Sequence, residues 1–462
     1  MTAGSLALAV SLASAPAWSQ SISSEEAAAL RDEIGALKAR LEALESRLAA
    51  TPPVTTPATP PQAQVAATTA APATKPEAKG ARIEWKGSPQ IVEGDHTFKP
   101  KGRIQMDANY VSAPDGLNDR GLGFSTEARR IRLGAEGSIG SGIGYKLELE
   151  LSDNAVDLVD TFITYESGPV LLRLGNQNPL WGLDELTGDT SGSLMERAAF
   201  TDAFNFERRL GLSAQYSKGA LLLQAGVFSD DVTAVANSSD GGNGGDENNS
   251  FSIDGRAVLA PKFGKTQLHF GASAHWRNLK RIGDAGVRYR QRPYIHSSNS
   301  RLISTPVMVS DNELGYGGEF AVINGRWHGA AEVFFQRAAR REMSNVTFWG
   351  GYAEVGYFLT RGDTRAYKEG IFGATKPKKP IDKGGMGSVQ VNLRYDYLDL
   401  DDRDIVGGTQ NAYIVGVVWA PIQGLRFNAN YAHILYTDAM PLQSHDTSYD
   451  IDVIGTRFEF DF

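Results

Sequence analysis

Hydrophobic and polar residues alternate with a period of two over most of the chain from Ile83 onward. In residues 103–110, apolar residues hold the even positions and polar or charged residues hold the odd ones. The same alternation recurs in residues 146–151 and 267–276. A period of two predicts β-strands with one apolar and one polar face. We count about 16 such segments, which predicts an all-β fold.

The connections between these predicted strands alternate between short and long. Short turns are expected at residues 168–169, 218–219 and 324–325, whereas residues 278–312 form a long loop. Tight turns on one rim and long loops on the other are typical of outer-membrane β-barrels. One join departs from this rule, because residues 361–385 make a long connection on the rim of short turns.

The chain ends on an apolar strand. Residues 449–462 place Ile454, Phe458 and Phe460 on one face and finish on Phe462. An unpaired apolar edge invites aggregation in water, but in a closed barrel it pairs with the first strand. A terminal Phe on an alternating strand is similar to the insertion signal of bacterial outer-membrane proteins. We therefore expect residues 81–462 to form an antiparallel transmembrane β-barrel of about 16 strands in the bacterial outer membrane.

One insert, residues 174–209, does not follow the strand pattern. It carries helix formers, aromatic residues and paired charges, and it is several times longer than a usual connection. Long structured loops in compact domains are disproportionately functional. If the strands close into a barrel, we expect this loop to fold inward and narrow the bore.

The first 80 residues follow other patterns. Residues 1–19 form an apolar run that ends in small residues, which predicts a signal peptide, although the usual basic start is missing. In residues 24–49, Leu and Ile recur at alternating spacings of three and four, which predicts a short coiled coil. A helix packed on its own protein is the alternative. Residues 50–80 predict a Pro/Ala/Thr-rich linker that would hold the coiled coil in the periplasm, where it could contact the cell wall.

The composition excludes several classes of protein. A net charge of -8 argues against nucleic acid as a partner, and the absence of cysteine excludes disulfides and thiolate chemistry. No segment after the signal peptide has the roughly 18 to 20 apolar residues of a transmembrane helix. The histidines show no metal-ligand spacing and no serine has a nucleophile context, so we expect no metal, no other cofactor and no enzymatic activity.

Several segments from one end of the predicted barrel to the other are distinctive. In chain order they are FKPKGRIQMD, ARRIRLGAEG, VDTFITYESG, GLDELT followed by MER, RYRQR, and RAYK before a Lys/Pro-rich turn. Together they resemble the phosphate-selective porin O and P family of the bacterial outer membrane. The resemblance runs from about Trp85 to Phe462. It implies a trimer of 16-stranded barrels with the third loop folded inside each pore. The insert at residues 174–209 falls at the place of that loop.

The resemblance also implies roles for individual residues. Those that match the family's constriction are Arg103, Arg129, Arg130, Asp160 and Arg197. Those that match its arginine ladder are Arg288, Arg290 and Arg292. In extended chain this spacing places three guanidinium groups on one side, although an ordinary solvated basic loop is the alternative. Those that resemble its periplasmic lysine set are Lys86, Lys99, Lys368, Lys376, Lys378, Lys379 and Lys383. We expect Arg197 to face Arg130 and Asp160 across the bore.

The insert departs from the family pattern at the constriction. Glu185 stands where the family has a lysine, and Gly188 and Asp189 stand where it has a pair of serines, with Asp184 nearby. Carboxylates at the narrowest point would raise the cost of passing a multivalent anion. The resemblance therefore extends to the pore and its arginine-lined approach, and we do not extend it to a phosphate site.

These predictions favour an outer-membrane porin that passes small hydrophilic solutes by diffusion, with a weak preference for anions. Its expected partners are outer-membrane lipid, copies of itself in a homotrimer, and small anions or other hydrophilic solutes. The alternative is a structural barrel that tethers the envelope through the coiled coil. An outer-membrane hydrolase is the weakest option, because no nucleophile and base are found together.

Overall fold

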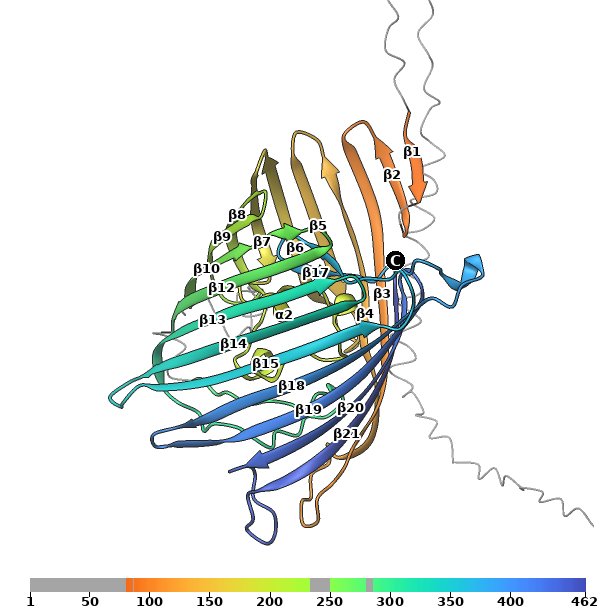
Figure 1. Cartoon of the computed structure of the whole chain (residues 1–462). Coiled ribbons are helices and arrows are strands. Elements are labelled where there is room, and N and C mark those ends of the chain that lie inside the picture. Colours follow the sequence, from red (N-terminus) through yellow and green to blue (C-terminus); the bar gives the residue numbers. More distant parts are fainter. Residues whose placement is uncertain (1–79, 86, 233–249, 280–285) are drawn as a thin grey trace, which may run out of the picture. The chain divides into compact units, whose positions relative to one another are not determined.

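The computed structural model describes residues 80–462, except for residue 86 and residues 233–249 and 280–285 (Figure 1). The expected signal peptide, the coiled coil and all of the linker before Gly80 lie outside the described residues, as does Lys86. In the described part of the chain, no helix is long and apolar enough to cross a membrane.

Sixteen strands in the described residues pair antiparallel with their neighbours and form a closed barrel. They are β3 (His96–Val111), β4 (Gly123–Ile139), β5 (Ile143–Glu150), β6 (Asp157–Ser167), β7 (Val170–Gln177), β8 (Arg209–Lys218), β9 (Leu221–Phe228), β10 (Phe251–Leu259), β12 (Thr266–Asn278), β13 (Ser310–Asn324), β14 (Trp327–Arg340), β15 (Val346–Phe358), β18 (Ser388–Asp402), β19 (Ile405–Ile422), β20 (Leu425–Thr437) and β21 (Tyr449–Asp461). The last strand, β21, pairs with the first, β3, and this pairing closes the barrel (Figure 1). The predicted all-β barrel is confirmed.

The remaining elements are short. A hairpin of β1 (Arg82–Trp85) and β2 (Pro89–Glu93) extends the sheet beside the start of β3. The two-residue strand β11 (Lys262–Phe263) pairs with the start of β12, and β16 (Ala366–Lys368) with β17 (Ile371–Gly373) forms a separate hairpin. The helical turns are α2 (Leu183–Leu186), η1 (Asp189–Ser191), α3 (Ala199–Ala203) and η3 (Ile381–Lys383).

Side chains alternate across the barrel wall as the sequence predicts. In β21, Ile454, Phe458 and Phe460 are exposed on the outer face, whereas Arg457 and Glu459 are buried on the inner face. In a membrane barrel the apolar face meets lipid and the polar face lines the interior, which inverts the arrangement of a water-soluble domain. The exposed apolar residues are therefore what a lipid-facing surface requires.

The lengths of the connections also follow the expected alternation. On one rim the joins are short, for example residues 140–142, 168–169 and 219–220, and on the other rim residues 279–309 make a long join. The predicted exception is present, because residues 359–387 connect β15 to β18 on the short-turn rim.

The barrel wall has two unequal parts. The strands β5 to β10 contain 8 to 11 residues each and form what we call the low wall. The strands β12 to β21 of the barrel contain 13 to 18 residues each and form the high wall. Inner-face side chains of the high wall are mostly buried, whereas those of β5 and β6 are mostly half-exposed. Open space therefore lies against β5 and β6 of the low wall.

Candidate functional site

The long join between β7 and β8 is the predicted insert. The sequence placed its start at residue 174, but β7 continues to Gln177, which pairs with Arg209 at the start of β8. Pro179 then ends the strand, since proline has no N–H to donate to a ladder. The irregular part of the insert is therefore residues 178–208, and it contains α2, η1 and α3.

Aromatic side chains fix one side of the insert to the high wall. Trp181 stacks on Phe206 with ring centroids 4.1 Å apart, and Phe200 stacks on Phe334 of β14 at 5.9 Å. Trp181 also meets the ring of His275 of β12 edge-on at 4.0 Å. All five side chains are buried, so this half of the barrel interior is a packed apolar core.

Polar contacts fix the insert to several further strands. The Glu332 carboxylate of β14 accepts the backbone N–H groups of Leu183 and Asp184 at 2.8 and 2.7 Å, which satisfies the free donors at the start of α2. Asn392 of β18 donates to the Ser193 carbonyl at 2.7 Å. Glu332 and Asn392 are both buried, so these contacts fix the insert to β14 and β18.

Four arginines surround the carboxylate of Asp189 in η1. Arg197 of the insert lies 3.0 Å from Asp189, and Arg130 of β4 lies 3.1 Å from it. Arg103 of β3 and Arg132 of β4 follow at 3.3 and 3.6 Å. Burial raises the pKa of Asp189, but the four guanidinium groups outweigh this effect and hold its pKa well below the usual range. The insert thus carries a permanent negative charge into a cradle built by the wall.

A β-bulge explains how adjacent residues Arg129 and Arg130 share a face. Gln105 of β3 pairs with Arg130, and the next residue, Met106, pairs with Ala128, so Arg129 is the extra residue. In a regular strand neighbouring side chains point to opposite faces, and an inserted residue cancels this rule locally. Both arginines therefore reach the insert, where Arg129 lies 3.6 Å from Glu196.

Asp160 of β6 belongs to a second group of charges beside the cradle. Its carboxylate pairs with Lys146 of β5 at 2.5 Å and with Arg208 at 2.7 Å. Arg197 pairs instead with Asp189 and, at 3.5 Å, with Glu185. Arg197 and Arg130 thus lie on the same carboxylate, that of Asp189, whereas Asp160 pairs with Lys146 and Arg208.

The two groups together form what we call the constriction network, in which cations and anions are equal in number. The cations are Arg103, Arg130, Arg132, Arg197, Arg208 and Lys146. The anions are Glu148, Glu150, Asp160, Glu185, Asp189 and Asp461. The network thus contains six cationic and six anionic side chains, which come from five strands (β3, β4, β5, β6 and β21) and the insert.

Glu185 is a carboxylate of the insert with a pKa in the neutral range. Burial raises the pKa of Glu185 to about 7, and the Arg197 guanidinium only partly offsets this effect. Asp184, its neighbour, lies 3.3 Å from Arg394 of β18 and accepts the N–H of Ala198 at 2.7 Å. Asp184 therefore supports the shape of the insert, while Glu185 is placed beside the cradle.

The predicted arginine ladder lies on the long join between β12 and β13. Isolated bridges join Val287 to Met308 and Arg290 to Ser304, so this stretch is extended. Arg288 and Arg290 are exposed and Arg292 is half-buried, whereas the residues between them are buried. The three side chains therefore point to one side, as the spacing predicts. Arg292 reaches Asp202 of α3 at 3.5 Å.

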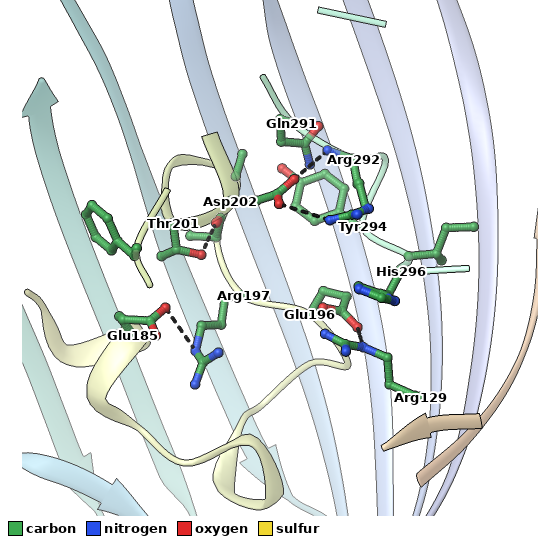
Figure 2. Close-up of a pocket in the computed structure, with 14 residues that line it drawn as sticks. Arg129, Glu185, Glu196, Arg197, Thr201, Asp202, Gln291, Arg292, Tyr294 and His296 are labelled. Atoms are coloured by element: carbon green, nitrogen blue, oxygen red, sulfur yellow. Dashed lines mark hydrogen bonds and ion pairs between the residues drawn. The ribbon is translucent and has the colours of Figure 1, made fainter. Parts of the chain in front are cut away.

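Figure 2 shows a cavity that the insert, the ladder segment and Arg129 enclose together. It has a volume of ≈ 230 Å³. Glu185, Glu196 and Asp202 come from the insert, and Arg292 comes from the ladder segment.

The predicted lysine set lies at the opposite end of the strands. Lys99 is half-buried in β3. The exposed members belong to the join between β15 and β18 and are Lys368, Lys376, Lys378, Lys379 and Lys383. Lys368 pairs with its neighbour Glu369 at 2.7 Å. No group of three or more potential metal ligands occurs in the described residues.

Residues 98–462 match the protein family described as phosphate-selective porin O and P. The chain belongs to this family. The porin is also 58% identical over 451 residues to an uncharacterized protein of Caulobacter vibrioides, a match that covers 96% of the porin and 91% of that protein.

Solved structures similar to the porin include an anion-selective porin from Comamonas acidovorans, with 11% identity over 79% of this chain and 100% of that one and a TM-score of 0.49. Another is OprB of Pseudomonas putida, with 12% identity, coverage of 80% and 94%, and a TM-score of 0.47. Family membership identifies the porin as a channel-type protein of the outer membrane.

Several charged residues of the porin's interior were not predicted from the sequence. Arg132 could have been found, since it lies two residues after Arg130 on the same face. Lys146 and Glu148 were recognised only as the polar face of a strand. Arg457 pairs with Asp107 at 2.7 Å and Glu196 at 2.6 Å, and only the closure of β21 on β3 brings it there.

Proposed function

We propose that this porin forms a water-filled channel through which small hydrophilic solutes diffuse passively, with residues 178–208 folded inward as its constriction. The observation that carries this proposal is the position of Asp189, which belongs to the insert and contacts arginines of β3 and β4. The aromatic anchor on the other side of the insert fills the interior beside the high wall. The free passage would then run between the insert and the low wall.

The constriction is expected to discriminate weakly between ions. Six cations and six anions cancel in the constriction network, so a permeating ion meets no strong net charge. The ladder lies on the long-loop rim, where the exposed Arg288 and Arg290 would attract anions over long distances. A weak preference for anions follows.

High specificity for phosphate is not expected. Asp189 already occupies the arginine cradle, because its Oδ1 lies 3.0 Å from Arg197 and its Oδ2 lies 3.1 Å from Arg130. An incoming phosphate would have to displace the Asp189 carboxylate. Because this carboxylate is attached to the chain, it loses less translational and rotational freedom on binding the arginines than a free anion does. We therefore infer that Asp189 lowers the affinity of the cradle for free anions.

Conductance in planar lipid bilayers tests the channel and its selectivity. The porin should give ohmic channels whose reversal potential in a KCl gradient favours Cl⁻ slightly over K⁺, with little block by phosphate. Insertion without conductance, or a preference for K⁺, would contradict the proposal.

Asp189→Asn tests the role of the tethered carboxylate. It removes one negative charge from the cradle, so the preference for Cl⁻ should increase several-fold and millimolar phosphate should reduce the current. Asp382→Asn, in the exposed turn η3, is the matched control and should behave as wild type. A phosphate effect of equal size in both variants would argue against the cradle.

We further propose that the porin is a homotrimer that associates through the low wall. A strand of 8 residues, tilted by about 45°, rises roughly 19 Å, which is less than the apolar band of about 25 Å around membrane barrels. Leu172, Leu174 and Leu212 are exposed on its outer face. A wall too short for lipid is better covered by neighbouring copies of the chain.

A further inference from the structure

The cavity of Figure 2 contains charges of both signs in equal number. Three arginines line it, namely Arg129, Arg197 and Arg292, and three carboxylates line it, namely Glu185, Glu196 and Asp202. Each arginine has one of these carboxylates as a neighbour, at 3.6, 3.5 and 3.5 Å respectively. Those separations exceed the 2.7 to 2.9 Å of a strong charge-assisted hydrogen bond. The cavity walls are therefore charged, but the arginine and the carboxylate of each pair are too far apart for a strong hydrogen bond.

Closer contacts outside the cavity hold two of these side chains in place. Arg197 lies 3.0 Å from Asp189, and Glu196 accepts from Arg457 at 2.6 Å. The arginine and the glutamate are thus oriented before any solute arrives. A preorganised site loses less conformational freedom when it binds a ligand.

Gln291 adds a polar group that lacks a partner. Its side chain is only 3% exposed and lines the cavity, and its Oε1 atom has no hydrogen-bond partner. The Nε atoms of Arg129 and Arg292 are likewise buried without a hydrogen-bond partner. Buried polar atoms normally pair with protein, water or a ligand, so this cavity has acceptor and donor capacity to offer.

Apolar residues complete the lining. Phe206 and Ile295 line the cavity together with Ala198 and Ala199. The volume of ≈ 230 Å³ corresponds to roughly eight water molecules at about 30 Å³ each. The cavity therefore suits a solute with a short hydrocarbon chain and charged ends.

We propose that this cavity binds small zwitterionic solutes of the amino-acid type. An anion would be attracted by the three arginines but repelled by the three carboxylates. A cation would be attracted by the carboxylates and repelled by the arginines. A zwitterion can place its carboxylate toward Arg129 and Arg292 and its ammonium toward Glu185. Gln291 Oε1, beside Arg292, offers a further acceptor in the lining. Figure 2 shows Glu185 on the opposite side of the space from Arg129 and His296.

The cavity gives the channel a substrate class, and in this sense the inference rests on the proposed function. Arg197 and Glu185 belong both to the cavity and to the constriction network. A zwitterion bound in the cavity would therefore wait directly beside the narrowest part of the passage. Binding there raises its local concentration and favours its permeation over that of ions of a single charge.

Calorimetric titration of the detergent-solubilised porin with three probes of one chain length tests the binding. The probes are 4-aminobutanoate, butanoate and butylammonium. We expect 4-aminobutanoate to bind at least ten-fold more tightly than either of the others. Equal affinities, or preferential binding of butanoate, would overturn the proposal.

Two variants connect the binding to the cavity. Gln291→Leu removes the unpartnered amide at constant charge, and His296→Gln changes a half-exposed lining residue. Each should weaken 4-aminobutanoate binding, by about ten-fold for Gln291→Leu, whereas Gln423→Leu, in an exposed turn, should have no effect. Unchanged binding in both cavity variants would place the site elsewhere and refute the proposal.

Single-channel recording separates this inference from the proposed function. Tight 4-aminobutanoate binding to a protein that never conducts would refute the channel and keep the site. Normal conductance without selective binding of 4-aminobutanoate would keep the channel and refute the site.

Discussion

At the scale of single residues, carboxylates of the same chain neutralise the arginines inside the porin. The Asp189 carboxylate lies beside four guanidinium groups, and the Glu332 carboxylate accepts two backbone N–H groups. Like charges as close as these arginines would repel one another without a counter-ion. The family resemblance led us to expect carboxylates here as an obstacle to anions, and the geometry gives them a structural role as well.

Glu185 should make the selectivity of the channel depend on pH. Burial raises its pKa to about 7, so it is largely charged at pH 8 and largely neutral at pH 6. Acidification removes one negative charge beside Arg197, and the reversal potential should therefore move toward Cl⁻ between pH 8 and pH 6. Glu185→Gln should show no such shift and should match, at pH 8, the wild-type value at pH 6. The same shift in both proteins would show that a group other than Glu185 causes it.

Gly102 should be needed for closure of the barrel. Its N–H donates to the Phe462 carbonyl at 3.1 Å, and a Cβ at this position would lie 2.2 Å from the Phe462 ring. Gly102→Ala should destabilise the folded barrel by about 1–3 kcal/mol through overpacking. The measurement is the temperature at which the folded band is lost on a denaturing gel. Gly318→Ala, where a Cβ meets nothing within 4 Å, is the control and should not lower that temperature.

At the scale of elements, periodicity predicted the strands because a barrel wall exposes one face to lipid and one to the interior throughout its length. The insert was also visible, since it lacks this period. The bulge at Arg129 was not predicted, because it depends on how β3 and β4 pair. The partners of Asp160 were not predicted either, since Lys146 and Arg208 reach it only after β5, β6 and the insert assemble.

The bulge makes deletions in β4 unequal. Removing Arg129 deletes the extra residue, so Ala128 stays outside, Arg130 stays inside and the rest of the strand keeps its register. Removing Ile131 would instead turn either Arg130 toward lipid or Leu133 toward the interior. We expect the Arg129 deletion to fold and insert with heat-modifiable migration on gels, and the Ile131 deletion to fold poorly. Equal folding of the two would show that the bulge does not set the register.

At the scale of the whole molecule, the two walls differ in both height and composition. On the outer face of the high wall, aromatic rings form contacts across neighbouring strands, such as Phe335 with Trp349 and Trp419 with Phe427. Aromatic girdles mark the lipid interfaces of membrane barrels. The exposed residues of β7 and β9 on the low wall are aliphatic instead. The height of the two walls and the aliphatic surface of β7 and β9 support the proposal that the high wall faces lipid and the low wall a neighbouring copy of the chain.

Cross-linking tests this assignment directly, because the chain has no cysteine and single-cysteine variants carry no background. Leu172→Cys and Leu212→Cys place a thiol on the low wall, and Val415→Cys places one on the high wall, all at exposed outer positions. In vesicles, a flexible bis-maleimide should link the low-wall variants into dimers, since neighbouring copies bring these surfaces together around the symmetry axis. The Val415→Cys variant should remain monomeric on the denaturing gel, because its thiol faces lipid. Cross-links only through Val415→Cys would move the interface to the high wall, and the short strands β5, β7 and β9 would then have to be covered by a locally thinned bilayer.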